Sequence, residues 1–436
     1  TQGYSSAASD VYKRQDVNLS LIMNSYMNRS MSKVDISRIF KLSKPTSSKI
    51  TAELEELGLI CPDPEEDSRT NIPGVKPLKY KLNVDLGIIA ILDMSTVETQ
   101  IQLCDFGGSI LSETKISDKE LIRFKDIVNF CDIVDGLIKS LPFGRKLLAV
   151  CVAIPCAVNK LTGLIDWSPR FEIDENFDLF SFLSERYPHS KILIENDVQL
   201  MMSGEIYKGM LSDGSISYAL LMYVDSGLGG SFFVDGKLEN GEEGKAGDLG
   251  FFPYLNSNGE YIYLDSVISI NAIKKTLNKK IAEGKKSCLP VGKTIHFSQI
   301  RDAYFKGDSL VINIVEKTAY ETANALKSLL EILNINFIII SGRITQFGER
   351  YRTIIESSLK DRFPSVRVRY SQIQDSAIRE GAMLLSSRKI ISDIIPIAPK
   401  KFNKRYRAEL HPLKFFLDRR KRDFLSDTFY ILPRPR

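Results

Sequence analysis

Apolar residues follow two different periods along this chain, and the two alternate. Short apolar runs bounded by polar residues, such as 191–194 and 218–224, are the pattern of buried β-strands. Similar runs lie at 88–93, 147–155, 336–341 and 365–370. Apolar residues at helical spacing predict helices over 122–141, 268–282, 310–333, 350–359 and 377–385. The alternation predicts an α/β protein.

Polar residues follow two of the predicted strands at the point where each strand ends. Asn196 and Asp197 come directly after residues 191–194, where open α/β sheets place their ligands. The stretch Asp225-Ser-Gly-Leu-Gly-Gly230 follows residues 218–224, and its glycines permit a tight turn and a close approach of the backbone to a ligand. Taken alone this stretch is a hairpin turn. After an Asn-Asp strand end it indicates a ligand-binding loop.

The region from residue 16 to residue 82 has a different pattern. Apolar positions between residues 17 and 27, between 33 and 41, and between 46 and 57 predict three short helices. Pro45 lies near the start of the third helix, and Gly58 follows its end. Two short helices joined by a tight turn are the helix-turn-helix signature, although a plain three-helix bundle has the same pattern. The start of a recognition helix contacts DNA, so the predicted DNA-binding residues there are Lys44, Thr46, Ser47, Ser48 and Lys49.

A turn-forming segment follows these helices. Residues 69–82 contain Pro73-Gly74, Pro77 and three lysines, which suits a β-hairpin wing beside the helices. Arg69 and Lys76 are the predicted phosphate contacts of this wing. The acidic residues 63–67 would repel phosphates, so we expect them to lie away from the DNA.

The order of the motifs resembles the ROK family of sugar kinases and sugar-responsive repressors. The motifs that carry the resemblance are Asn196-Asp197, Ser226-Gly-Leu-Gly-Gly230, Val234-Asp-Gly-Lys-Leu238 and Gly247-Asp-Leu-Gly250. The resemblance covers residues 16–386. It implies a winged helix-turn-helix at 16–82, followed at 83–386 by a two-lobed actin-like (ribonuclease H-like) domain of the ATPase type.

The resemblance also implies a sugar site. Its ligand-binding residues would be Arg170, Asn196, Asp197, Asp248 and Asp265. Asp197 occupies the position of the catalytic base, and here we expect it to be vestigial. Asp248 and Asp265 replace glutamates of the family, and Arg170 replaces an asparagine. Asp248 or Asp265 taken singly is equally explained as a loop carboxylate or a helix cap.

Two other sites of the family have lost their residues. The first phosphate loop, Asp-x-Gly-Gly-Thr-Lys in the family, is Asp93-Met-Ser-Thr-Val-Glu98 here. Asp225 adds a further acid beside the second phosphate loop, and the Gly-Gly-Gly adenosine loop is Ser341-Gly-Arg343. We therefore expect no ATP turnover and no cofactor. The four zinc-ligand positions carry Phe251, Asn256, Asn258 and Tyr263, so we expect no metal.

Composition narrows the class of protein. Of 436 residues, 43% are hydrophobic and 26% charged, as in globular proteins, and no apolar run is long enough for a membrane span. Six cysteines without a CxxC pair predict a reducing, cytoplasmic location. Residues 386–436 hold 14 Lys and Arg against 5 Asp and Glu, a charge of +9, which leaves −4 for the rest of a chain of net charge +5. We expect residues 387–436 to form a basic tail, and polar residues 1–15 to be disordered, with a non-native origin left open.

These features predict a sugar-responsive DNA-binding regulator, a repressor. Its partners would be operator DNA and a sugar or sugar derivative, with a homodimer or a dimer of dimers as the assembly. One alternative is an active sugar kinase with a DNA-binding head. Another is an effector domain that acts through protein partners without DNA.

Overall fold

The computed structural model describes most of the chain. The described residues are 22–23, 25–27, 29–64, 77–95, 98–117, 122–142, 144–159, 165, 171–172, 178–255, 259–290 and 292–397. The chain divides into two compact units, a first unit drawn from residues 1–155, 167–195 and 382–436 and a second drawn from 156–166 and 196–381. The predicted domain boundaries at residues 82 and 386 stay predictions. Within the described ranges no helix is long and apolar enough to cross a bilayer.

The predicted helix-turn-helix is present in the first unit. Helix α2 (Lys33–Ile39) starts at a capping box, in which the Ser32 side chain accepts from the backbone of Asp35 and the Asp35 side chain accepts from the backbone of Ser32. Helix α3 (Lys44–Glu56) starts at Ser43, whose Oγ accepts from the backbone N–H of Thr46 at 3.3 Å. The chain leaves α3 at Gly58, whose φ of 69° suits glycine. Local capping chemistry therefore sets the limits of both helices.

A small antiparallel sheet accompanies these helices, as expected for the predicted wing. Its strand order is β1 (Met31–Ser32), β3 (Lys79–Leu82), β2 (Ile60–Pro62), with Ile60 opposite Leu82. Arg69 and Lys76, on the predicted wing tip, lie outside the described residues. Asp63 is buried, forms an ion pair with Lys81 at 3.4 Å and accepts a hydrogen bond from the hydroxyl of Ser30 at 2.5 Å. Its negative charge is therefore compensated by residues of the first unit.

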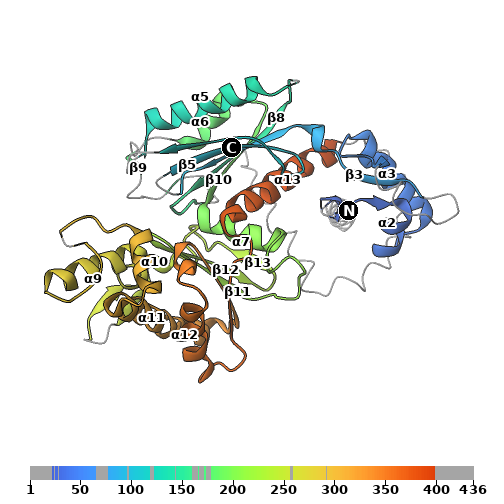
Figure 1. Ribbon diagram of the computed structural model, residues 1–436. Helices are drawn as coiled ribbons and strands as arrows, with labels where there is room; N and C mark the ends of the chain where they lie inside the picture. The colour runs from blue at the N-terminus through green and yellow to red at the C-terminus, as the bar shows by residue number, and fades with distance from the viewer. Residues whose placement is uncertain are drawn as a thin grey trace, which may run out of the picture. The chain divides into compact units, whose positions relative to one another are not determined.

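The larger sheet of the first unit has five strands. Their order is β10 (Lys191–Asn196), β8 (Leu147–Ile154), β4 (Ile88–Asp93), β5 (Glu98–Asp105), β6 (Ile110–Ser117). Strands β4, β5 and β6 are antiparallel neighbours, whereas β4 and β8 are parallel. Helices α5 (Phe124–Ser140) and α6 (Leu179–Arg186) lie together on one face of this sheet (Figure 1), where Arg186 of α6 pairs with Asp132 and Asp135 of α5.

The second unit repeats this arrangement. Its sheet has the order β13 (Lys237–Glu239), β12 (Leu228–Val234), β11 (Ala219–Val224), β16 (Phe337–Ser341), β17 (Arg367–Tyr370). An antiparallel hairpin, β11–β12, is again followed by parallel strands, β16 beside β11 and β17 beside β16. Two units of one topology are what the predicted two-lobed actin-like fold requires, and the predicted α/β class is confirmed.

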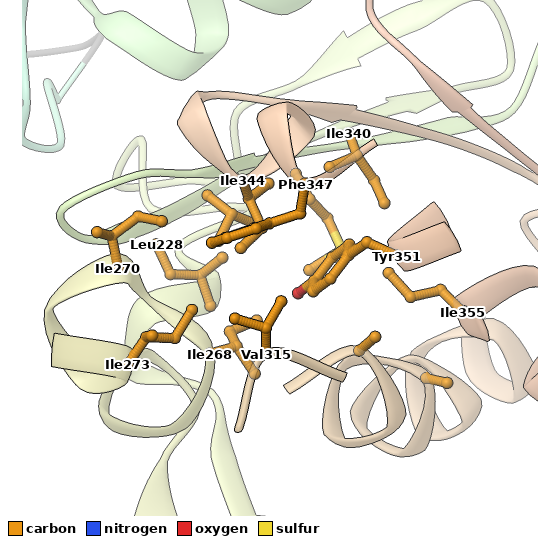
Figure 2. Packing of buried hydrophobic residues seen from close by; sticks show 14 of the residues in the cluster. Leu228, Ile268, Ile270, Ile273, Val315, Ile340, Ile344, Phe347, Tyr351 and Ile355 are labelled. Carbon is orange, nitrogen blue, oxygen red and sulfur yellow. The ribbon is translucent and has the colours of Figure 1, made fainter. Parts of the chain in front are cut away.

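The core of the second unit lies between this sheet and its helices. The helices are α8 (Asp265–Ile268), α9 (Ile270–Ala282), α10 (Phe297–Phe305), α11 (Ser309–Leu333) and α12 (Glu349–Lys360). Figure 2 shows Phe347, Tyr351, Val315 of α11 and Ile340 of β16 packed together in one apolar cluster. The Tyr351 hydroxyl stays satisfied in this apolar setting because it meets Thr318 Oγ1 at 3.4 Å.

The closing helix is longer than the sequence pattern predicts. Helix α13 spans Ala377–Ile397, so it does not end at Leu385. The apolar face continues through Ile390 and Ile391, which are both buried, and Lys191 forms an ion pair with Asp393. The sequence pattern predicts an earlier end of the helix because Ser386 and Ser387 interrupt the apolar run. Both serines are fully buried in the structure.

Candidate functional site

Asn196 and Asp197 form the junction between strand β10 and helix α7 (Asp197–Tyr207). The Asn196 Oδ1 caps α7 by accepting from the backbone of Val198 at 3.0 Å and of Gln199 at 3.1 Å, and its Nδ2 donates to the carbonyl of Cys156 at 3.1 Å. Asp197 follows in the first turn and is 5% exposed, with its Oδ1 accepting from the N–H of Val198 at 2.8 Å. The positive end of the helix dipole stabilises a carboxylate there. By capping α7, Asn196 fixes the start of the helix and therefore the position of the Asp197 carboxylate.

The glycine-rich stretch is a hairpin whose glycines make room for its neighbours. Residues Asp225–Gly227 form the turn between β11 and β12, with the N–H of Asp225 donating to the carbonyl of Gly227 at 2.9 Å. A Cβ at Gly229 would lie 2.7 Å from Val198 Cγ2 of α7, and one at Gly230 would lie 2.6 Å from Leu249. The glycines therefore let α7 and the turn η2 (Leu249–Phe251) approach β12.

Asp248 and Asp265 both lie near Gly250, whose backbone approaches Leu228 at the start of this same strand. A Cβ at Gly250 would lie 3.5 Å from Asp248 Oδ1 and 3.9 Å from Asp265 Cβ, and a Cβ at Gly227 would lie 3.4 Å from Asp265 Oδ1. Burial raises the pKa of the Asp265 carboxyl, although the hydrogen bond from the backbone of Leu228 acts in the opposite direction. Asp265 thus lies beside the first residue of β12, and Asn196 and Asp197 lie at the start of α7, whose Val198 approaches Gly229 of the same strand. The fifth, Arg170, lies outside the described residues.

The acids in the two loops that correspond to phosphate loops of the family are engaged within the chain. In the first unit, Asp93 Oδ1 accepts from the N–H of Ser95 at 2.9 Å and from its hydroxyl at 2.5 Å, and Glu98 pairs with Lys115 at 3.8 Å. In the second unit, Asp225 pairs with Arg343, with Nη2 of Arg343 at 2.5 Å from Oδ1. The sequence pattern marks both residues but does not predict that they pair. The signal for the pair in the sequence is the opposite charge of two loops that follow strands of one sheet.

Two of the four positions that correspond to zinc ligands, Phe251 and Tyr263, lie at a small antiparallel hairpin. Strands β14 (Pro253–Leu255) and β15 (Tyr261–Tyr263) are antiparallel, and the rings of Phe251 and Tyr263 meet edge to face with centroids 5.6 Å apart. Asn256 and Asn258 lie outside the described residues. Within the described ranges, no group of three or more His, Cys, Asp and Glu is placed to hold a metal ion.

Purified protein is expected to contain no stoichiometric zinc. Zinc sites of proteins are built from thiolates, imidazoles and carboxylates, and an aromatic pair such as Phe251 and Tyr263 supplies none of these ligands. Elemental analysis of protein dialysed without chelator checks this expectation. About one zinc per chain would contradict the assignment of these positions.

The predicted DNA-binding residues of α3 differ in exposure. Lys44 and Ser48 are exposed and Lys49 is half-buried, whereas Thr46 and Ser47 are buried. Thr46 shares a hydrogen bond of 2.7 Å with Ser43, and the Ser47 hydroxyl donates to the carbonyl of Lys44 at 3.0 Å. The first turn of α3 therefore has an outer basic face and an inner hydroxyl face.

Comparison with known proteins places the chain in one family. The sequence model described as the ROK family matches residues 91–389. A xylose repressor of Caldicellulosiruptor bescii is 24% identical over 406 residues, which are 87% of this chain and 97% of that protein. An N-acetylglucosamine repressor of Escherichia coli O157:H7 is 23% identical over 338 residues, 76% of this chain and 80% of that protein.

Two solved structures share the fold. A ROK family transcriptional regulator described as a homolog of the E. coli MLC protein has a TM-score of 0.70 at 21% identity, over 84% of this chain and 94% of that chain. A ROK family glucokinase from Streptomyces griseus has a TM-score of 0.54 at 19% identity, over 69% of this chain and 99% of that chain. The match of the family model over more than half of the residues, together with this fold, shows that the chain belongs to the ROK family.

Proposed function

We propose that this protein is a sugar-responsive transcriptional regulator, a repressor, that binds operator DNA and does not turn over ATP. The observation that carries the proposal is the winged helix-turn-helix in the same chain as the ROK domain. The regulator structure accordingly matches 84% of this chain, whereas the glucokinase matches 69%. A DNA-binding role is in keeping with the cytoplasm as its location.

The outer face of α3 is the proposed DNA-reading surface. Lys44, Ser48 and Lys49 lie on this face at the start of the second helix of the motif, which is where a recognition helix meets bases and phosphates. Thr46 and Ser47 would support this surface from inside, because their hydroxyls bond within the first turn. A homodimer would place two such helices on half-sites one helical turn, or a multiple of it, apart.

The sugar effector would bind beside the start of β12. Asn196, Asp197, Asp248 and Asp265 offer carboxylate and amide groups, and charge-assisted hydrogen bonds to hydroxyls are the strong ones. Asp248 and Asp265 are each one methylene shorter than the glutamates of the family, which leaves room for a substituent. Arg170 favours an acidic or phosphorylated sugar.

Replacing Lys49 by alanine in the full-length protein is expected to weaken operator binding and to flatten its dependence on salt. One lost phosphate contact lowers the slope of log K against log salt concentration by about 0.9. Genomic footprinting locates the operator, and fluorescence anisotropy at several salt concentrations gives the slope. Lys327→Ala, on the exposed face of α11, is the matched control and leaves the slope unchanged. The DNA-binding proposal is wrong if no protected site is found, or if affinity does not depend on salt.

An active sugar kinase is the second candidate, because kinase structures of the family share the fold of residues outside the winged helix. The test is ATP turnover with the sugar that stabilises the protein most in a thermal-shift screen. The regulator proposal predicts no turnover above the rate without protein. Turnover that disappears in Asp197→Asn would establish the kinase instead.

A further inference from the structure

The carboxyl ends of two parallel strands lie side by side in the second unit. Strand β11 and strand β16 are hydrogen-bonded neighbours, with Tyr223 opposite Ser341. Gly342 has a φ of 91°, and a Cβ on it would lie 2.4 Å from the carbonyl oxygen of Val224, so the two loops are in backbone contact. Open α/β sheets bind their ligands outside the carboxyl ends of such strands. This strand end is therefore a position at which a ligand would be expected.

The carboxylate of Asp225 fills this position and is bound as a ligand would be. Arg343 donates to it from Nη2 at 2.5 Å, from Nε at 2.9 and 3.0 Å, and from its backbone N–H at 3.1 Å. The backbone N–H of Ser226 donates to the same carboxylate at 2.7 Å. Asp225 is 8% exposed, and the hydrogen bonds to it raise the pKa of Arg343. A guanidinium fork combined with backbone N–H groups is the donor set that proteins use for phosphate as well as for carboxylate.

The surroundings hold this donor set in place and carry a second positive charge. The guanidinium of Arg343 lies over the ring of Phe297, 5.3 Å from its centroid. The N–H of Ile270 donates to the carbonyl of Asp225 at 2.7 Å, which fastens the loop to α9. Burial, and then the charge of Arg343, lower the pKa of Lys274 of α9, while the charge of Asp225 acts in the opposite direction.

We propose that Arg343 and the backbone N–H groups beside it form a receptor for a phosphate group, and that Asp225 is an anion built into the chain that occupies it. A ligand phosphate would need the same N–H groups that the carboxylate already holds. It would also meet the negative charge of Asp225 at close range. The native protein therefore excludes phosphate-bearing ligands from this strand end, and removal of the carboxylate opens the receptor to them. The same pair links the loop before β12 to Arg343, which directly precedes Ile344 of the hydrophobic core.

Asp225→Ala in the full-length protein tests this proposal, with inorganic pyrophosphate and ADP as probes. Isothermal titration calorimetry is expected to show pyrophosphate binding to Asp225→Ala at least about tenfold tighter than to the native protein, the factor that one lost repulsion of about 1.4 kcal/mol corresponds to. The double variant Asp225→Ala/Arg343→Ala should lose this gain. Glu316→Ala is the matched control, because it removes the carboxylate from another arginine pair of the same unit, Arg350–Glu316, away from the strand ends. Glu316→Ala should bind pyrophosphate no more tightly than the native protein does.

The two probes separate the possible sources of the phosphate group. Tighter binding of ADP than of pyrophosphate by Asp225→Ala identifies a nucleotide ligand, and equal binding identifies the phosphate alone; both support the receptor. If Asp225→Ala does not fold without a ligand, Asp225→Ser takes its place, and pyrophosphate must raise its melting temperature more than chloride at equal ionic strength. The proposal is overturned if native protein binds pyrophosphate as tightly as the variant, or if a folded variant gains no binding.

Discussion

Asp197→Asn is expected to abolish the response of DNA binding to sugar while operator binding without sugar stays intact. The substitution keeps the shape of a buried side chain at the start of α7 and removes its charge. Each charge-assisted hydrogen bond to a sugar hydroxyl that becomes neutral costs roughly 1–3 kcal/mol. Two such bonds would weaken sugar binding by about thirtyfold or more, since 1.4 kcal/mol is about a factor of 10. The assay is operator anisotropy with increasing amounts of the sugar selected by thermal shift.

Asp178→Asn is the matched control for this experiment. Asp178 is an exposed acid at the start of another helix, α6, where its carboxylate accepts from the backbone of Ser181 at 3.0 Å. Asparagine caps helices as well as aspartate does, so this variant should keep both its stability and its sugar response. A sugar response in Asp197→Asn equal to that of Asp178→Asn would remove Asp197 from the effector site.

Gly381→Ala is expected to destabilise the second unit strongly. Within the second unit, residues 377–381 at the start of α13 pack against α7, and glycine is present on both sides of this contact. A Cβ at Gly381 would lie 1.9 Å from the carbonyl oxygen of Leu200, and one at Gly204 would lie 2.3 Å from that of Ala377. Backbone atoms cannot move aside as a flexible side chain can, so we expect a cost of about 3 kcal/mol, the upper end for overpacking. The melting temperature should fall by roughly 6–12 °C, at about 2–4 °C per kcal/mol for units of this size.

Gly136→Ala isolates the effect of the contact from the effect of the residue type. Gly136 lies in helix α5, and a Cβ added there meets no atom within 4 Å. Alanine is favoured over glycine in a helix by about 1 kcal/mol, so this variant should melt at or slightly above the native temperature. A melting temperature of Gly381→Ala at or above that of Gly136→Ala would contradict the close helix contact. Since α7 carries Asp197 at its start, this contact also fixes the position of the proposed effector site.

The elements that the sequence predicts well are those defined by local chemistry. Helix α3 is bounded by Ser43 and Gly58, whose capping roles depend on a few neighbouring residues, and strands β11 and β16 are continuous apolar runs in a buried sheet. The grouping of Asn196, Asp197, Asp248 and Asp265 in a sugar site is what the resemblance implies, and it stays a prediction; the structure places Asp265 beside Leu228 of β12 and Asn196 at the start of α7, whose Val198 approaches Gly229.

What the sequence does not predict depends on contacts between distant residues. Asp225 and Arg343 are 118 positions apart, and only the parallel pairing of β11 with β16 brings them together. The burial of Thr46 and Ser47 inside the turn, and of Ser386 and Ser387 in α13, is likewise set by packing. A single polar residue in a pattern does not reveal whether its environment is water or a hydrogen-bonded interior.

Release of operator DNA by sugar tests the central claim most directly. The native full-length protein is bound to the operator found by footprinting, and the fraction of DNA bound is measured against a panel of sugars, amino sugars and their phosphates. The proposed function predicts that at least one of them lowers the bound fraction in a saturable way, and that the same compound raises the melting temperature of the free protein. Operator binding that no compound of the panel changes, although one of them stabilises the free protein, would contradict it.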